Sequence, residues 1–202
     1  MKKLMSDAMG LSDIGQIIPP EQFNMVDADD YILHEDNEKI FFMIKSRSDE
    51  YAFTNLALVH VDGSSAVSKK RLVKRYEYYK NVPSEISIET AGTIDLDAEI
   101  KFKLGGKIFS IDVTKNQIEL LKDLDKSLVA IERTVSGNQS LLEHSFQTLE
   151  LASKSTNGTY CTGDLSQEFR QINEYSFNWI RSCRNEYIQK DFTNIFEKYL
   201  YN

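Results

Sequence analysis

An unbroken alternation of apolar and charged residues near the middle of the chain constrains its fold more than any other feature. Apolar side chains occupy every second position, with charged side chains between most of them: Ile94, Leu96, Ala98, Ile100, Phe102 and Leu104. A period of two over this length is typical of a half-buried β-strand, because successive side chains of a strand point to opposite faces. The pattern therefore predicts a strand with one face in a core.

A hairpin and a helix are predicted directly after this strand. Gly105 and Gly106 separate it from a second alternating run, residues 107–113, and a glycine pair suits a tight hairpin turn. Residues 114–117 then have the spacing of a capping box, which opens a helix. The helix predicted at residues 115–132 has one apolar face: Ile118, Leu121, Leu124, Leu128 and Ile131. Such a face is buried, and one open end of a β-barrel is its expected place.

The residues upstream predict further strands and a mixed leader. Strand-like runs occur at residues 39–45, 51–62, 71–79 and 83–89, with turns about every ten residues, which is the spacing of a barrel or sandwich. The leader, residues 1–37, contains Pro19-Pro20, which ends any helix begun at residues 11–18. Residues 21–34 suit one or two short helical turns with these apolar anchors: Phe23, Val26, Tyr31 and Leu33.

The rest of the chain predicts helices. Ser136-Gly137-Asn138 is expected to end the capping helix, and a second helix is predicted at residues 140–151. Residues 153–163 are polar and contain glycine, so they predict a loop. No proline follows Ser136.

A long run without helix breakers closes the chain. It begins at Asp164, a good N-cap, and is either one continuous helix or two helices with a bend near Lys190, where Asp191 offers a second N-cap. Residues 138–202 are too few to form a core of their own. Their apolar side chains must therefore dock on the barrel or on another copy of the chain, and self-association is the favoured alternative.

Composition narrows the class of protein. The net charge of −7 opposes nucleic-acid binding. No run approaches the ~18 apolar residues of a membrane span, and residues 1–18 lack the apolar core of a signal peptide. The two cysteines, Cys161 and Cys183, have neither metal-ligand spacing nor a disulfide framework. A cytoplasmic protein without a cofactor is expected.

Several motifs resemble those of the bacterial pleckstrin-homology family. They are Tyr51-Ala-Phe-Thr-Asn55, Tyr79-Lys-Asn-Val-Pro-Ser-Glu-Ile86 and, most specifically, Ile88-Glu-Thr-Ala-Gly92 followed by Asp95-Leu-Asp-Ala-Glu99. The tail, residues 138–202, resembles the helical oligomerisation region of the YvbH-like members in length and helical pattern.

This resemblance implies an α+β fold. Residues 38–133 would form a pleckstrin-homology-like antiparallel β-barrel of about seven strands capped by a C-terminal α-helix. An α-helical hairpin or a long helix would follow as the tail. The pattern alone predicts about six strands, so the additional strand is expected within residues 51–70. The resemblance also implies homo-oligomers.

Two charged clusters are candidate sites. The basic one comprises Lys69, Lys70, Arg71, Lys74 and Arg75, which could bind an anionic lipid or another polyanion. The favoured interpretation is a solvated strand start whose lysines guard a sheet edge. The acidic one comprises Asp95, Asp97 and Glu99, whose oxygens suit Ca²⁺ or Mg²⁺. Their ~6.7 Å spacing along a strand is too wide for one ion, so a mixed-charge outer face or a subunit interface is favoured.

The tail carries a third candidate surface, an apolar and aromatic stripe that could bind a partner or pack internally: Phe169, Ile172, Trp179, Tyr187, Phe192, Phe196 and Tyr199. The three histidines, His34, His60 and His144, have no catalytic neighbours at motif spacing, so no enzyme is predicted. We predict a non-enzymatic assembly module that homo-oligomerises and presents a protein-binding surface. The alternative is a peripheral receptor for anionic lipid.

Overall fold

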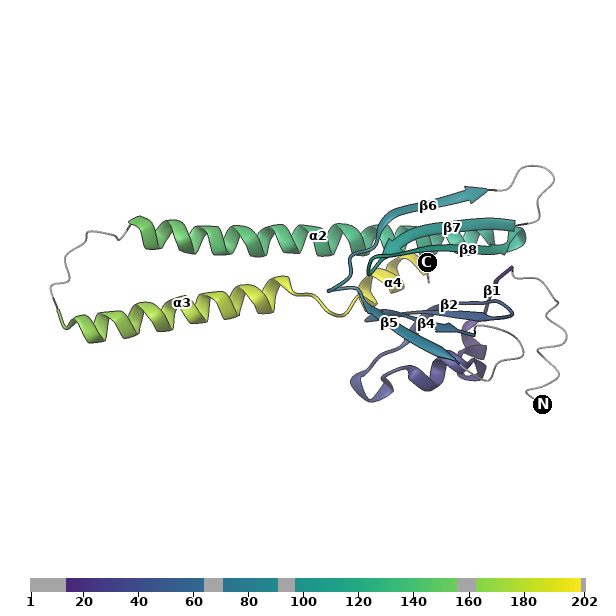
Figure 1. Ribbon diagram of the computed structural model, residues 1–202, viewed down its shortest axis with the longest axis horizontal. Helices are drawn as coiled ribbons and strands as arrows, with labels where there is room; N and C mark the ends of the chain where they lie inside the picture. The colour runs from purple at the N-terminus through teal and green to yellow at the C-terminus, as the bar shows by residue number, and fades with distance from the viewer. Residues whose placement is uncertain (1–13, 64–70, 91–96, 156–162, 201–202) are drawn as a thin grey trace. The chain divides into compact units, whose positions relative to one another are not determined.

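Two compact units make up the chain. A computed structural model describes residues 14–63, 71–90, 97–155 and 163–200. The first unit comprises residues 1–132 and 190–202, and the second comprises residues 133–189. The first unit holds all the described strands, and the second holds two helical segments (Figure 1).

One sheet of the first unit has five antiparallel strands. In spatial and chain order they are β1 (Gln16–Ile17), β2 (Ile40–Lys45), β3 (Asp49–Thr54), β4 (Ala57–Asp62) and β5 (Leu72–Glu77). The strand predicted at residues 51–62 is two strands, because the chain turns at Asn55 and Leu56. The additional strand expected within residues 51–70 is therefore confirmed. Strand β1 was not predicted, since two residues are too few to show an alternation.

The second sheet has three antiparallel strands: β6 (Ser84–Thr90), β7 (Asp97–Leu104) and β8 (Lys107–Thr114). A parallel bridge between Gly15 and Val113 joins the two sheets at one corner, and the Gly15 N–H donates to the Asp112 oxygen at 2.7 Å. A Cβ on Gly15 would lie 2.6 Å from Cγ2 of Ile44, so the close approach requires glycine. Within the described residues, the predicted barrel is thus two sheets with one shared corner.

The turn between β7 and β8 is the predicted glycine hairpin. Gly105 and Gly106 have φ angles of 57° and 75°, in the left-handed region that favours glycine. A Cβ on Gly105 would lie 2.6 Å from the Tyr76 ring, whereas a Cβ on Gly106 would meet nothing within 4 Å. Glycine is therefore required at position 105 for two reasons: the turn needs a positive φ angle, and the Tyr76 ring of β5 lies too close for a Cβ atom.

We expect Gly105→Ala to lower the free energy of unfolding by about 1–3 kcal/mol more than Gly106→Ala does, because only the first must displace Tyr76. Urea denaturation of both variants measures the difference. The second variant is a matched control, since both positions have positive φ. Equal losses in the two variants would mean that the contact with Tyr76 adds nothing.

The leader forms short helical turns, as predicted. They are the 3₁₀ helices η1 (Pro20–Met25), η2 (Asp27–Tyr31) and η3 (His34–Asp36). Of the predicted anchors, Val26 is buried, and Phe23 is partly buried and packs against the core. Tyr31 and Leu33 are exposed, so the prediction was wrong for these two residues. A 3₁₀ turn repeats every three residues, which puts Ile32 rather than its neighbours on the buried row with Phe23 and Val26.

Two buried carboxylates attach the leader to the sheet. Glu50 on β3 accepts from the backbone N–H of Ala28 at 2.7 Å. Glu38 accepts from the backbone N–H of Leu33 at 2.8 Å. Each acid also has a cationic partner, Lys45 for Glu50 and Arg75 for Glu38. The leader turns are therefore held by charge-assisted hydrogen bonds as well as by apolar packing.

Helix α2 (Ile118–Ser155) begins near the predicted position, after the 3₁₀ turn η4 (Lys115–Gln117). The predicted capping box does not form. Instead, the Gln117 side-chain amide bonds both backbone groups of Ile17, at 2.8 and 2.9 Å. As predicted, the apolar face of its first turns is fully buried: Leu121, Leu124, Leu128 and Ile131.

Helix α2 does not end at residues 136–138, so that prediction was wrong. Gly137 lies inside the helix. A glycine within a helix costs only about 1 kcal/mol relative to alanine. Apolar residues continue at helical spacing on both sides of it, with Ile131 and Val135 before and Leu142 after. Burial of these side chains outweighs the cost of the glycine.

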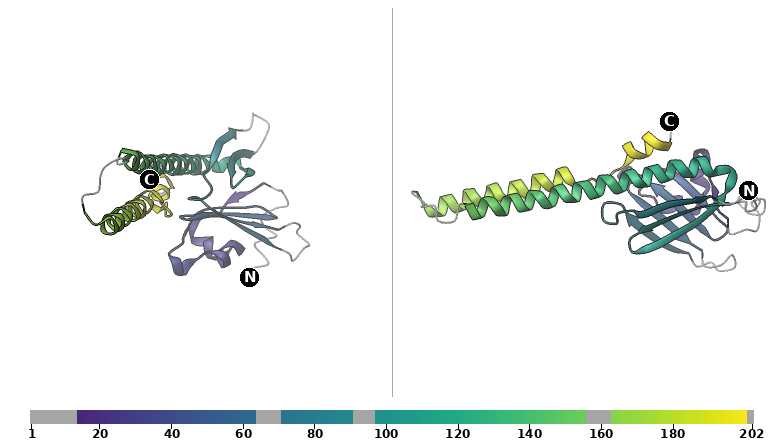
Figure 2. Two further views of the ribbon diagram at one scale, coloured as in Figure 1. Left: turned by 60° about the vertical axis from the view of Figure 1, so that its left-hand side comes forward. Right: turned by 90° about the horizontal axis from the view of Figure 1, so that it is seen from above.

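The remaining chain forms two helices, α3 (Leu165–Tyr187) and α4 (Thr193–Leu200). This confirms the alternative with a bend near Lys190. The predicted N-cap Asp164 forms, since it accepts from the Ser166 N–H at 2.9 Å. Asp191 accepts from the Thr193 N–H at 2.8 Å, but the carbonyl of Phe192 accepts the first bonds of the helix, so Asp191 lies one residue before the N-cap position. In the second unit α3 runs alongside the last part of α2 (Figure 2), whereas α4 belongs to the first unit.

Candidate interaction surfaces

The predicted basic cluster is largely engaged in ion pairs where the structure describes it. Arg75 Nη2 lies 2.8 Å from Glu38 Oε1, and Arg71 Nη2 lies 3.1 Å from Asp27 Oδ2. Lys74 is exposed, while Lys69 and Lys70 lie outside the described residues. Two of the three described cations therefore attach β5 and its start to the leader, which leaves less charge for an anion.

The predicted acidic cluster lies on a mixed-charge face of the second sheet. Glu99 on β7 accepts from Ser110 and lies 3.0 Å from Lys101 Nζ, and the Ser110 hydrogen bond is the main cause that lowers the pKa of Glu99. Asp97 is half-buried, and Asp95 lies outside the described residues. In the described part of the chain, no three His, Cys, Asp or Glu side chains are grouped to hold a metal ion.

The predicted aromatic stripe of the tail divides between the two units. Phe169, Ile172, Trp179 and Tyr187 lie on α3 in the second unit, whereas Phe192, Phe196 and Tyr199 lie in the first. Phe192 and Phe196 are fully buried within that unit. Tyr199 is half-buried, and Lys198 Nζ lies 5.1 Å from its ring centroid.

The apolar stripe of α3 is only partly covered within the second unit. Its positions recur at three- and four-residue steps and are apolar except for Ser176: Leu165, Phe169, Ile172, Ser176, Trp179 and Cys183. At its C-terminal end Cys183 is buried, and Trp179 Nε1 donates to the backbone oxygen of Ser145 on α2 at 3.4 Å. At its N-terminal end Leu165, Phe169 and Ile172 are 64–69% exposed. We call these three residues the hairpin patch.

Helix α2 carries a matching repeat in the second unit. Buried or half-buried residues recur at alternating three- and four-residue steps: Val135, Asn138, Leu142, Ser145 and Leu149. Two such repeats are typical of helices that pair as in a coiled coil. This repeat is visible in the sequence. It crosses Gly137, however, where the sequence predicts the end of a helix.

A buried polar cluster links the two sheets of the first unit. His60 on β4 lies 2.8 Å from Asp49 Oδ1 through Nε2. Lys107 on β8 lies 3.4 Å from the other ring nitrogen of His60, Nδ1, and the His60 ring stacks on Tyr51 at 4.6 Å. With Nε2 protonated, the neutral imidazole donates to Asp49 and accepts from Lys107. No local motif in the sequence predicted this cluster.

The Asp49–His60 hydrogen bond predicts a loss of stability in acid. Its donation holds the pKa of Asp49 below its ordinary value of 3.8. A carboxylate whose pKa is lower in the folded state stabilises the fold when the pH is above its ordinary pKa. This contribution is lost as the pH falls through the folded-state pKa. We expect Asp49→Asn to flatten the decline in unfolding free energy below about pH 4, measured by urea denaturation.

The control for this prediction is Asp36→Asn, which removes one charge from an exposed position on η3. An unchanged acid decline in Asp49→Asn would show that the hydrogen bond from His60 does not contribute to it.

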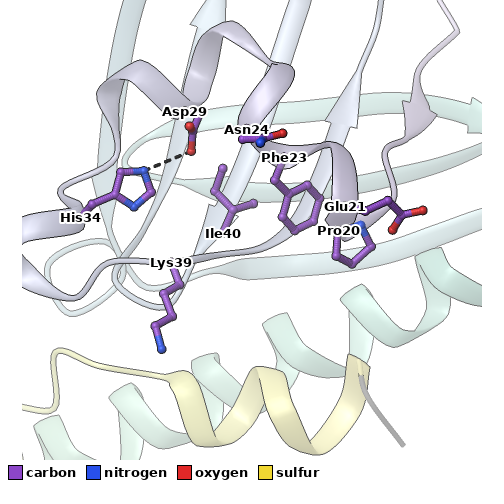
Figure 3. A pocket seen from close by; sticks show the side chains of 8 residues that line it. All are labelled: Pro20, Glu21, Phe23, Asn24, Asp29, His34, Lys39 and Ile40. Carbon is purple, nitrogen blue, oxygen red and sulfur yellow. Dashed lines mark hydrogen bonds and ion pairs between the residues drawn. The ribbon is translucent and has the colours of Figure 1, made fainter.

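An open depression of about 480 Å³ lies beside the leader turns (Figure 3). Its lining residues are Pro20, Glu21, Phe23, Asn24, Asp29, His34, Lys39 and Ile40. Within it His34 Nε2 lies 3.1 Å from Asp29 Oδ1, and the His34 side chain is 56% exposed. The lining mixes both signs of charge on an exposed surface, so it selects no ligand class.

Among the helices in the described ranges, none has the length and apolar character that a membrane span requires.

Comparisons with known proteins cover the whole length of the chain. Residues 8–132 match the bacterial PH domain, and residues 143–202 match the YvbH-like oligomerisation region. The uncharacterised protein YvbH of Bacillus subtilis (strain 168) is 50% identical over 202 residues, which is 100% of this chain and 99% of that protein. The uncharacterised protein YjqA of the same strain is 31% identical over 97 residues, which is 48% of this chain and 76% of that protein.

A solved structure is similar over nearly all of this chain. It is the crystal structure of a PH domain containing bacterial protein from Exiguobacterium sibiricum 255-15. The two chains are 46% identical with a TM-score of 0.86, and the match covers 93% of this chain and 100% of the other. The similarity therefore includes helices as well as sheets.

Proposed function

This chain belongs to the bacterial PH domain family, and from that premise we propose that it is a non-enzymatic assembly module that homo-oligomerises through its helical hairpin. The hairpin consists of the part of α2 in the second unit and α3. In this proposal, self-association places several PH-like domains in one particle, and their outer faces are available to bind a protein partner. The second unit has no sheet in the described residues, so its helices supply the contacts between copies.

The observation that carries the proposal is the hairpin patch. Leu165, Phe169 and Ile172 continue a stripe that is buried at Cys183, yet each of the three exposes more than half of its surface. A contiguous apolar patch of this kind favours a protein interface. The patch lies within the residues that match the YvbH-like oligomerisation region, and this supports a second copy of the chain as the partner.

The test introduces charge into the patch. We expect wild-type protein to have a solution mass that is a multiple of 23.3 kDa. Phe169→Glu/Ile172→Glu is expected to reduce that mass to a single chain, because an interface would bury both carboxylates without partners. Light scattering coupled to size-exclusion chromatography measures both masses. Far-ultraviolet circular dichroism establishes that the variant keeps its helices.

The matched control is Gln171→Glu/Asn173→Glu. It adds the same charge to exposed positions of the same helical turn, outside the stripe. This variant should retain the wild-type mass. A monomeric wild-type chain, or an unchanged mass in Phe169→Glu/Ile172→Glu, would contradict assembly through the hairpin patch.

A further inference from the structure

The C-terminal segment contacts the first unit as a short linear ligand would. Lys190 Nζ lies 5.4 Å from the ring centroid of Tyr79. Asn55 donates from Nδ2 to Asp191 Oδ2 at 3.0 Å. The backbone oxygen of the same Asn55 accepts from the N–H of Phe192 at 2.9 Å. Consecutive residues of the segment are thus each bound by a side chain or a backbone group far away in the sequence.

Two phenylalanines complete the docking. The Phe192 ring lies 5.8 Å from Tyr78 in an edge-on arrangement at 85°. The Phe196 ring stacks on Phe41 at 5.4 Å with an interplanar angle of 18°. Phe192 directly precedes α4 and Phe196 lies within it, and both rings contact Tyr78, so one surface receives both. Both side chains are fully buried. We call the receiving residues Phe41, Asn55, Tyr78 and Tyr79 the α4 seat.

A non-helical stretch separates the segment from helix α3. Helix α3 ends at Tyr187, and residues 188–192 are not helical. Asp191, in the same segment, bonds the first N–H of α4, because its Oδ1 accepts from the Thr193 N–H at 2.8 Å. The other carboxylate oxygen of Asp191 is bound by Asn55. The whole recognition element, Lys-Asp-Phe-x-x-x-Phe, therefore lies after the end of α3, partly in the non-helical stretch and partly in α4.

We propose that the α4 seat is a recognition site for the Lys-Asp-Phe-x-x-x-Phe helix and that the C-terminal segment of a second copy can occupy it by exchange. A second copy has the same sequence, so it reproduces every contact of Lys190, Asp191, Phe192 and Phe196. The segment also belongs to the residues that match the oligomerisation region. Exchange rests on the proposed self-association only because assembly brings two copies together. In an assembled pair, tethering raises the local concentration of the second copy's C-terminal segment to the millimolar range.

The test measures binding of a fluorescent peptide of residues 188–202 to the full chain. In wild type, the chain's own segment occupies the seat and competes. In full-length Phe192→Ala/Phe196→Ala this competition is weakened while the seat is unchanged. We therefore expect the peptide to bind this variant at least about tenfold more tightly than wild type. If the variant is unfolded alone, the peptide should restore its circular dichroism signal, since a ligand of the native state shifts the folding equilibrium.

Peptide controls isolate the recognition element. A peptide with Phe192→Ala and Phe196→Ala should not bind, whereas a peptide with Asn194→Ala and Glu197→Ala should bind as the wild-type peptide does, because both positions are exposed on α4. Full-length Phe196→Leu, a milder change, provides a second receptor that keeps an apolar side chain at the site. It should bind the wild-type peptide more tightly than wild-type protein does.

Equal binding of the wild-type and alanine peptides, or no binding of the wild-type peptide to either folded receptor, would overturn the proposal. Solution mass is measured on the same samples. An oligomer that does not bind the peptide removes this inference and leaves assembly through the hairpin patch intact. A monomeric chain that binds the peptide supports the seat and contradicts the hairpin proposal, so the two failures are distinguishable.

Discussion

Replacing Phe192 with alanine is expected to lower the free energy of unfolding by about 3–5 kcal/mol, the range found for fully buried phenylalanines. Terminal segments usually tolerate substitution because they are weakly packed. Here the side chain is fully buried beside Tyr78, and its N–H is bonded to Asn55. Alanine would leave a cavity between the last helix and the sheet, which the aromatic neighbours cannot fill without moving. Urea denaturation followed by far-ultraviolet circular dichroism measures the loss.

The control in the same C-terminal segment is Asn194→Ala, at an exposed position of α4. It should change the unfolding free energy by no more than about 0.5 kcal/mol. A comparably small effect for Phe192→Ala would mean that the C-terminal segment is not part of the folded unit. A large effect would also show that assembly should not be tested by truncating the chain after Glu132 to remove the hairpin. Such a truncation removes a part of the core together with the hairpin.

Replacing Glu38 with alanine is expected to cost about 3–5 kcal/mol, because removing one partner of a buried ion pair leaves the other charge uncompensated. The Glu38 side chain is fully buried, and Oε1 lies 2.8 Å from Arg75 Nη2. The same oxygen accepts from Thr54 Oγ1 at 2.5 Å. One carboxylate therefore joins the leader, the sheet and its edge strand. Thermal and urea unfolding both measure the effect.

A double-mutant cycle with Arg75→Met separates the ion pair from the rest of this cluster. If Glu38 and Arg75 stabilise the fold together, Glu38→Ala/Arg75→Met should cost less than the sum of the two single variants by about 1–3 kcal/mol. The exposed Glu35→Ala, on η3, controls for loss of a nearby carboxylate. Additive costs would show that the two residues act independently, and Glu38 would then contribute through its bonds to Leu33 and Thr54.

Features that depend on a few neighbouring residues were predicted correctly. The alternation before Gly105 gave strand β7, and the glycine pair gave the hairpin, because side-chain direction and turn geometry are local. Asp164 forms an N-cap for the same reason, since the bond is made two residues along the chain. Asp191 makes the same kind of bond one residue before the N-cap position of α4. The prediction that the helix ends at Gly137 was wrong. A glycine costs only about 1 kcal/mol, and the packing of the whole helix outweighs that cost.

The candidate surfaces were predicted less well, because spacing does not specify what a side chain packs against. The sequence placed Phe169 and Phe196 on one stripe of one tail. In the structure the first is 69% exposed in the second unit, whereas the second is fully buried in the first unit. The basic cluster was predicted with both a binding and a structural interpretation. The ion pairs of Arg71 with Asp27 and of Arg75 with Glu38 favour the structural one. Both acids lie far away in the sequence, so the spacing of the cluster did not predict them.

The sequence by itself determined the succession of strands and helices and, through its family motifs, the kind of fold. Only the tertiary structure decided which helix joins which unit. The bond between Asn55 and Asp191 spans 136 positions of the chain, and neither residue lies in a motif that names the other. Because side-chain directions follow the local backbone geometry, a few neighbouring residues are enough to predict local structure. Partners brought together by the path of the entire chain leave no such pattern, so burial of Phe192 and exposure of the hairpin patch could be read only from the folded protein.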